Sequence, residues 1–150
     1  MDPIFDKQFE ASWRDVDANG HVANTAYVAY AIDIRIAFFS SCGFPPQQFL
    51  KKGFGPVIKS DFVEYFRELM MLEKFTVTIE NGGFSEDGSR FRVVNNIYKE
   101  ERVPSARITS VGGWLDLKER RLIEPPDVIK NAWKSLPKTD DFEILKSSIK

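Results

Sequence analysis

Residues 25–39 read T-A-Y-V-A-Y-A-I-D-I-R-I-A-F-F, a stretch of about four helical turns in which only Asp33 and Arg35 carry charge. A surface helix keeps one polar face, whereas a helix that is apolar on nearly every side is normally buried all round. Gly43 and the pair Pro45-Pro46 follow shortly and are typical of a helix end. The stretch therefore predicts one long helix at the centre of the fold.

Five segments around this helix have the composition of β-strands. Residues 4–13 place Phe5, Phe9, Ala11 and Trp13 at alternate positions with polar residues between them, the pattern of a half-buried strand. Four later segments are rich in Val, Ile, Phe, Tyr and Thr: residues 57–66, 74–80, 90–99 and 105–117.

The breaks between the later strands indicate how they are connected. They carry Gly82-Gly83, Asp87-Gly88 and Pro104, so the strands from residue 74 onward are expected to form an antiparallel meander. The sequence thus predicts an α+β fold, with a five-stranded antiparallel sheet wrapped around one long central helix. We expect one domain over residues 1–150, with a core at about 4–126 and a C-terminal helical extension at about 127–150.

A single five-stranded sheet covers only one side of such a helix. The remaining apolar surface and the exposed sheet edge both favour pairing with a second copy of the chain. We therefore expect a homo-oligomer.

Composition narrows the kind of partner. The chain has 150 residues, is 43% hydrophobic, and carries 21 basic and 22 acidic side chains without a run of five or six like charges. Neither nucleic acid nor a membrane surface is suggested, so a small-molecule partner is favoured. Met1 is followed by Asp-Pro, and no stretch approaches the roughly 18 apolar residues that span a bilayer. A cytoplasmic protein without membrane insertion is expected.

The reactive residues exclude further classes. The chain has one cysteine, Cys42, and one histidine, His21. No internal disulfide, thiolate metal cluster or His-rich metal site can form within one chain, and any Ser-His-Asp arrangement would need His21. Cys42, close to the expected helix end, is interpreted as a packing residue. We expect neither a metal nor a cofactor.

Three segments carry a family resemblance. D-V-D-A-N-G-H-V-A-N-T-A-Y-V-A-Y (residues 15–30, with Arg35 beyond), V-I-K-S-D-F-V-E-Y (57–65) and W-L-D-L-K-E-R-R-L-I-E-P-P (114–126) resemble the hotdog-fold acyl-CoA thioesterases of the 4-hydroxybenzoyl-CoA thioesterase type. The similarity runs in order from residue 4 to about 126. It implies a hotdog fold, a dimer or tetramer with active sites at the subunit interface, and hydrolysis of an acyl-CoA thioester to a free acid and CoA.

The resemblance places the catalytic carboxylate at Asp17, as nucleophile on the thioester carbonyl or as general base for water. Asp is also common as a cap of turns and helices, so a structural role for Asp17 is the alternative. Gly20 allows the backbone to approach a ligand, and the N–H groups of residues 21–25, including Asn24, are suited to stabilising a negative oxygen. His21 would contact substrate or orient Asp17, unless it is a hydrogen-bonded scaffold residue. Ala23 departs from the usual G-H-V-N-N motif.

Other carboxylates have competing interpretations. Asp15 is interpreted as a hydrogen-bond acceptor that fixes the loop. Asp33 and Arg35 are expected to form a mutual or interfacial ion pair, although some related hotdog enzymes use a carboxylate on this helix, which makes Asp33 the runner-up base. Glu64 is a third candidate.

The substrate would contact both apolar and basic residues. Tyr27 is a candidate for the acyl pocket, and a plain core role is its alternative; Tyr30 and Ile34 are expected in the core. The CoA phosphates need cations, for which the candidates are Lys59, Arg67, Arg90 and Arg92.

Two other functions stay open. The chain could act on an acyl carrier protein, in which case a basic rim would matter more than a nucleotide site. It could also be a non-catalytic hotdog protein that binds an acyl or aromatic ligand. The acyl group itself cannot be read from the sequence, because pocket depth depends on tertiary packing.

Overall fold

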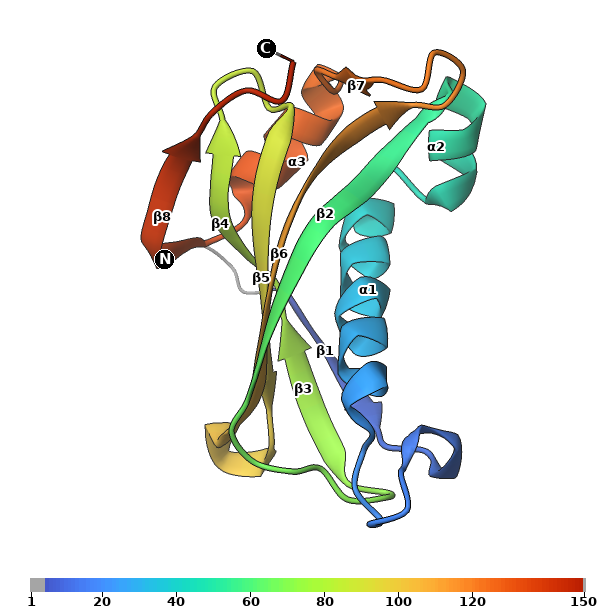
Figure 1. Cartoon of the computed structure of the whole chain (residues 1–150), viewed down its shortest axis with the longest axis vertical. Helices are drawn as coiled ribbons and strands as arrows, with labels where there is room; N and C mark the ends of the chain where they lie inside the picture. The colour runs from blue at the N-terminus through green and yellow to red at the C-terminus, as the bar shows by residue number, and fades with distance from the viewer. Residues whose placement is uncertain (1–4, 150) are drawn as a thin grey trace.

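The computed structural model describes residues 5–149 (Figure 1). Its helices are α1 (Asn24–Ser41), α2 (Pro46–Lys52) and α3 (Asp127–Ser135), and 3-10 turns lie at Trp13–Asp15 and Glu100–Arg102. Its strands are β1 (Asp6–Glu10), β2 (Phe54–Tyr65), β3 (Lys74–Thr78), β4 (Glu80–Ser85), β5 (Arg90–Tyr98), β6 (Pro104–Asp116), β7 (Leu122–Ile123) and β8 (Lys138–Leu145).

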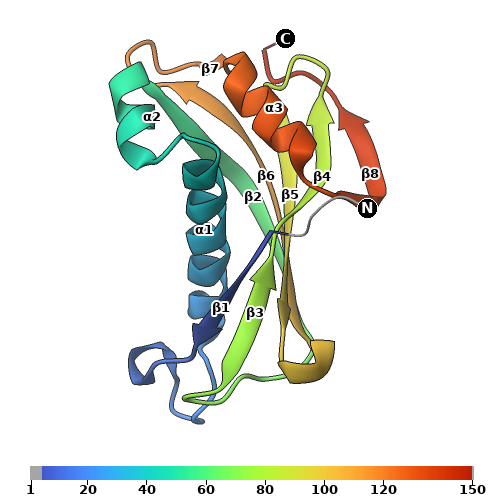
Figure 2. The same ribbon diagram turned by 180° about the vertical axis from the view of Figure 1, so that it is seen from behind.

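The strands form one curved sheet against which α1 lies, as Figures 1 and 2 show from opposite sides. β2 pairs with β6, and β6 pairs with β5. β5 in turn pairs with β3 and with β4, while β1 pairs with β3 and β8 with β4. A long helix against a curved antiparallel sheet was expected, and the sheet is antiparallel except where β8 runs parallel to β4. The expected strand number was wrong, because the sheet has eight strands and not five.

The central helix is confirmed, but its burial differs from the expectation. Tyr27, Tyr30 and Ile34 are buried against the sheet, whereas Ile32 and Ile36 on the other side are 44% and 45% exposed. The expectation that α1 is buried all round is therefore wrong for a single chain. The physical reason is that one sheet covers one side of a helix only.

The glycines at 82 and 83 do not break the chain between strands. Both lie within β4, where a Cβ on Gly83 would stand 2.7 Å from the carbonyl oxygen of Glu143 in β8. A Cβ on Gly82 would stand 3.0 Å from Nε of Arg92. These glycines permit close packing and not a turn. The predicted turn at Asp87-Gly88 does connect β4 to β5, with Gly88 at φ +76°.

At both ends of the chain, the secondary structure differs from the sequence-based expectation. Residue 4 lies outside the described residues, β1 covers only Asp6–Glu10, and Trp13 is 76% exposed in a 3-10 turn. The helical extension expected at about 127–150 ends with α3, and Lys138–Leu145 form β8, parallel to β4. Lys138–Leu145 form a strand because β4 has an open edge with which they can pair. A local sequence pattern does not predict such a pairing partner.

Arg35 does not pair with Asp33. Its Nε donates to Asn95 Oδ1 (2.8 Å) and an Nη donates to Ser110 Oγ (2.7 Å), while Ser110 Oγ donates to the carboxylate of Asp61 on β2. Burial lowers the pKa of Arg35 to about 10, and Asp61 acts against this shift. The expected mutual ion pair is wrong, because Arg35 points under the helix toward the sheet whereas Asp33 is exposed.

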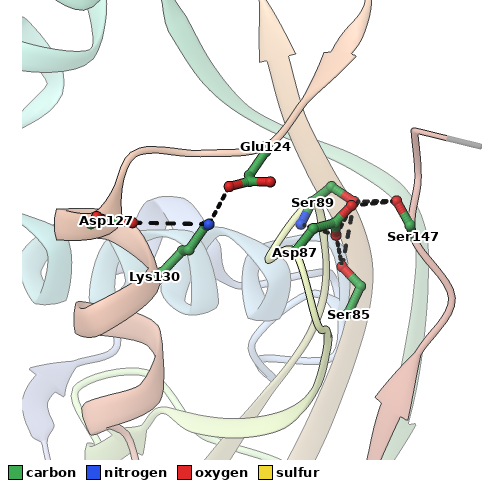
Figure 3. A network of polar contacts seen from close by, with 7 residues as sticks. All are labelled: Ser85, Asp87, Ser89, Glu124, Asp127, Lys130 and Ser147. Atoms are coloured by element: carbon green, nitrogen blue, oxygen red, sulfur yellow. Dashed lines mark hydrogen bonds and ion pairs between the residues drawn. The ribbon is translucent and has the colours of Figure 1, made fainter.

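A second polar cluster holds the end of the chain against the β4–β5 turn (Figure 3). Asp87 Oδ1 accepts from the hydroxyls of Ser85 and Ser89, each at 2.7 Å, and from the N–H of Ser89 at 3.0 Å. The Ser147 hydroxyl donates to Oδ2. Burial acts to raise the pKa of Asp87, but these donors outweigh it and hold that pKa below its ordinary range.

Asp87→Asn is expected to lower the free energy of unfolding by about 1–2 kcal/mol at pH 7, because an amide cannot accept on both sides. A carboxyl with a lowered pKa stabilises the fold above its unfolded-state pKa, near 4, and this contribution is lost as the pH falls toward the folded-state value. Thermal unfolding between pH 7 and 3 should therefore show the two proteins converging in acid. Glu86→Gln, at the exposed neighbour, is the control. A constant difference at every pH would contradict this assignment.

Candidate active site

The loop between β1 and α1 is a tight turn built on Asp17. The Asp17 N–H donates to the carbonyl of His21 (2.8 Å), and the Gly20 N–H donates to the carbonyl of Asp17 (3.1 Å). Asp17 Oδ1 also accepts from the N–H groups of Asn19 (2.8 Å) and His21 (3.3 Å). Gly20 has φ +79°, a left-handed conformation that explains a glycine here. One carboxylate oxygen therefore supports the turn.

The loop is anchored on both sides. The Val22 N–H donates to the carbonyl of Leu69 (2.8 Å), and the Ala23 N–H donates to the carbonyl of Asp15 (2.7 Å). The Tyr30 hydroxyl donates to Asp15 Oδ2 at 2.7 Å, which confirms Asp15 as the acceptor that ties the loop to α1. Burial and then this carboxylate raise the pKa of Tyr30 above its ordinary value.

A surface pocket of about 290 Å³ opens beside this turn. It brings together five of the residues singled out from the sequence, namely Asp17, His21, Asn24, Tyr27 and Arg67. Gly20 lies in the same turn without lining the pocket. The other lining residues are Val22, Tyr65, Phe66 and Glu68.

The N-terminus of α1 lies at this pocket, which its first residue, Asn24, helps to line. Ala23 precedes the helix and supplies no side-chain cap. Within residues 5–149, the N–H groups of Asn24 and Thr25 have no protein acceptor. Such N–H groups, together with the helix dipole, favour a negative charge at this point.

Aromatic rings form one wall of the pocket. The Tyr65 hydroxyl donates to the carbonyl of Asn24 (3.3 Å), and the rings of Tyr65 and Tyr27 meet edge to face at 5.3 Å between centroids. Burial raises the pKa of Tyr27. The wall is apolar, with one hydroxyl fixing the end of β2 to the start of α1.

Glu68 is a pocket residue that the sequence analysis missed. Its own backbone N–H is the largest influence lowering its carboxyl pKa, and the nearby charges of His21, Lys99 and Arg67 act in the same direction. Glu68 reaches His21 only because residues 21 and 70 form a β-bridge. No sequence motif links these distant segments, so no local signal could have found it.

Four predicted residues lie elsewhere. Glu64 and Arg92 line a separate groove of about 550 Å³, because strand alternation turns Glu64 to the sheet face opposite Asp61. Arg92 also forms an ion pair with Glu143 (2.9 Å). Arg90 donates to Ser148 (3.3 Å), and Lys59 is exposed at the bulge in β2. Within a single chain, none of the four reaches the Asp17 pocket.

Residues 5–149 contain neither a candidate metal site nor a helix suited to crossing a membrane. No three His, Cys, Asp or Glu side chains in that range gather closely enough to hold a metal ion. None of the helices described there has both the length and the hydropathy for crossing a bilayer.

The chain has counterparts among known proteins. The model of the thioesterase-like superfamily matches residues 11–133. Among curated proteins, none matches the sequence.

Solved structures resemble the chain at low identity. A hypothetical protein from Staphylococcus aureus in complex with CoA has a TM-score of 0.81 at 18% identity, over 93% of this chain and 89% of that one. A 1,4-dihydroxy-2-naphthoyl-CoA thioesterase from Synechocystis has a TM-score of 0.79 at 17% identity, over 88% and 96%. A DHNA-CoA thioesterase from Staphylococcus aureus has a TM-score of 0.77 at 16% identity, over 88% and 87%. The architecture is thus the hotdog fold that the resemblance implied.

Proposed function

Because the chain belongs to the thioesterase-like superfamily, we propose that it hydrolyses an acyl-CoA thioester at the Asp17 pocket, giving a free acid and CoA. The observation that carries this proposal is that one pocket is lined both by the carboxylate of Asp17 and by Asn24, the first residue of α1, whose N–H has no protein acceptor within residues 5–149. Solved relatives with this fold include a CoA complex and CoA thioesterases, which supports the same substrate class here. The reaction would use water and no cofactor.

In this proposal Asp17 acts through its second carboxylate oxygen. Oδ1 is held by the N–H groups of the turn, whereas Oδ2 accepts from no protein donor within residues 5–149. As general base, Oδ2 takes a proton from water while the water oxygen attacks the thioester carbon. The C–S bond then breaks, and the CoA thiolate takes up a proton. As nucleophile, Oδ2 would attack the same carbon, and water would hydrolyse the resulting anhydride.

The helix N-terminus would supply the electrostatic part of catalysis. The carbonyl oxygen becomes negative when its carbon is attacked, and the N–H groups of Asn24 and Thr25, which have no protein acceptor within residues 5–149, would donate to it. His21 and Glu68 lie at the same pocket, where they would orient water or Asp17. Tyr27 and Tyr65 would contact the acyl group.

The proposal includes a homodimer formed through β2. This strand of 12 residues pairs with β6 on one edge and with no strand of residues 5–149 on the other. Ile58 and Phe62 on it are 43% and 63% exposed, and Ile32 and Ile36 of α1 are also uncovered. A long, apolar, unpaired edge beside an uncovered helix face favours pairing with a second copy.

The test is thiol release from a panel of short, long and aromatic acyl-CoA thioesters, with and without a chelator. We expect hydrolysis of at least one member, undiminished by chelation, since Asp17 and water suffice. No release across the panel would contradict the proposal, and activity lost on chelation would contradict the metal-free mechanism. Faster hydrolysis of the same acyl group on an acyl carrier protein would assign the enzyme to that substrate instead.

A further inference from the structure

Two lysines end the short helix that leads into β2. Lys51 and Lys52 form the last turn of α2 and are exposed, and within residues 5–149 neither has an ion-pair partner. Gly53 then closes the helix at φ +79°, its N–H donating to the carbonyl of Phe49 (2.9 Å). Phe49 packs on Phe44 at 4.6 Å between ring centroids, so the helix is firmly placed.

These lysines lie a strand length away from the pocket of their own chain. β2 starts at Phe54, directly after α2, and ends at Tyr65, which lines the Asp17 pocket. Its 12 residues span about 40 Å at about 3.3 Å per residue. Figure 1 shows α2 at one end of the molecule and the loop before α1 at the other.

In a dimer whose two-fold axis is perpendicular to the sheet, the lysines lie far from the pocket of their own chain but close to the pocket of the partner. This axis pairs the free β2 edges antiparallel and keeps both α1 helices on the same face, where Ile32 and Ile36 of the two copies cover each other. An in-plane axis would put the helices on opposite faces and leave those residues exposed. In the antiparallel pair, the start of one β2 lies against the end of the other. The α2 of one subunit therefore stands beside the Asp17 pocket of its partner.

The charge of the pocket lining in one chain indicates that cations must come from elsewhere if CoA is to bind. Within one chain its lining has two carboxylates, Asp17 and Glu68, and one permanent cation, Arg67. That balance is unfavourable for the phosphates of CoA, which need cationic donors. Two lysines from a second subunit make the net charge at the rim of the pocket positive.

We infer that Lys51 and Lys52 bind the CoA phosphates at the Asp17 pocket of the partner subunit. This inference rests on the proposed function, from which it takes CoA as the substrate. Lys51→Ala/Lys52→Ala should raise KM at least about tenfold for the best acyl-CoA, the effect of losing charge-assisted contacts. It should leave unchanged the hydrolysis of the N-acetylcysteamine thioester of the same acid, which has no phosphate. Lys134→Ala/Lys146→Ala, on the α3 and β8 side, is the control.

Mixed dimers test the placement across subunits. Subunits carrying Asp17→Asn are co-expressed with subunits carrying Lys51→Ala/Lys52→Ala, and the heterodimer is isolated through two tags. One of its two sites then combines an intact Asp17 with intact lysines from the other chain. We expect about half of the wild-type activity at low acyl-CoA concentration. Activity no higher than that of the lysine variant would show that the lysines act within their own chain.

The outcomes separate this inference from the proposed function. An active wild-type enzyme with unchanged KM in the lysine variant overturns the inference alone. If the wild type hydrolyses no thioester, the proposed function fails, and calorimetric titration with CoA decides the inference: equal affinity in the wild type and the lysine variant, or no binding by either, overturns it. A monomer in light scattering at micromolar concentration also overturns it.

Discussion

Asp17→Asn is expected to lower kcat roughly 10²-fold or more while the fold stays intact, the scale of losing a general base or nucleophile. The amide oxygen can still accept from the N–H groups of Asn19 and His21, so the turn should survive. The amide nitrogen replaces Oδ2, which accepts from no protein donor within residues 5–149, and it cannot take a proton from water or attack a carbonyl. The effect should appear in kcat, measured by thiol release, and binding of a substrate analogue should persist.

Four comparison variants test the competing assignments. Asp15→Asn should act on the loop through Tyr30, and Asp33→Asn should have little effect, because Asp33 is exposed and lines no part of the pocket. His21→Ala and Glu68→Gln test whether those residues orient the reacting groups. If Asp33→Asn abolishes activity while Asp17→Asn retains it, the catalytic carboxylate lies on the helix. If Asp17→Asn loses thermal stability in step with activity, Asp17 caps the turn and is not the catalytic carboxylate.

The second large effect is on stability, at the polar cluster under α1. Asn95→Leu is expected to lower the free energy of unfolding by about 2–4 kcal/mol, because it leaves the partly buried guanidinium of Arg35 without one of its acceptors. Asn95 is fully buried and accepts from Arg35 Nε at 2.8 Å. It also donates to the carbonyl of Thr78 (3.1 Å). Urea unfolding of the variant measures the loss.

Removing the charge as well should recover much of this loss. The double variant Arg35→Met/Asn95→Leu is expected to be more stable than Asn95→Leu alone, since the cost comes from the unpaired charge. Asn96→Leu is the matched control, because Asn96 is the next residue of β5, faces the other side of the sheet and bonds to Glu80. Equal losses in Asn95→Leu and Asn96→Leu would contradict the role given to Arg35.

Patterns confined to a few neighbouring residues were sufficient for part of the structure. The apolar run at 25–39 predicted α1, and the Asp87-Gly88 pair predicted a hairpin, because helix and turn preferences act over a few residues. The candidate residues Asp17, Gly20, His21 and Asn24 were named through the family resemblance, whose motif is itself a short continuous stretch of sequence. All four lie within one loop and the first turn of one helix.

Contacts between distant segments determined the features of the fold and of the site that local patterns did not predict. Gly82-Gly83 have the composition of a turn but lie inside β4, where a Cβ on Gly83 would clash with the backbone of β8 and a Cβ on Gly82 would crowd Arg92. Lys138–Leu145 became a strand because β4 had an open edge. Glu68 and Tyr65 lie at the same pocket as Asp17 because residues 21 and 70 pair. Arg35 bonds to Asn95 and Ser110 and not to Asp33, because these two buried acceptors lie under the helix. A local pattern shows which elements form, but the hydrogen-bonding partner of an edge or a buried charge can be any residue that the fold brings near, and it is set only when the chain packs.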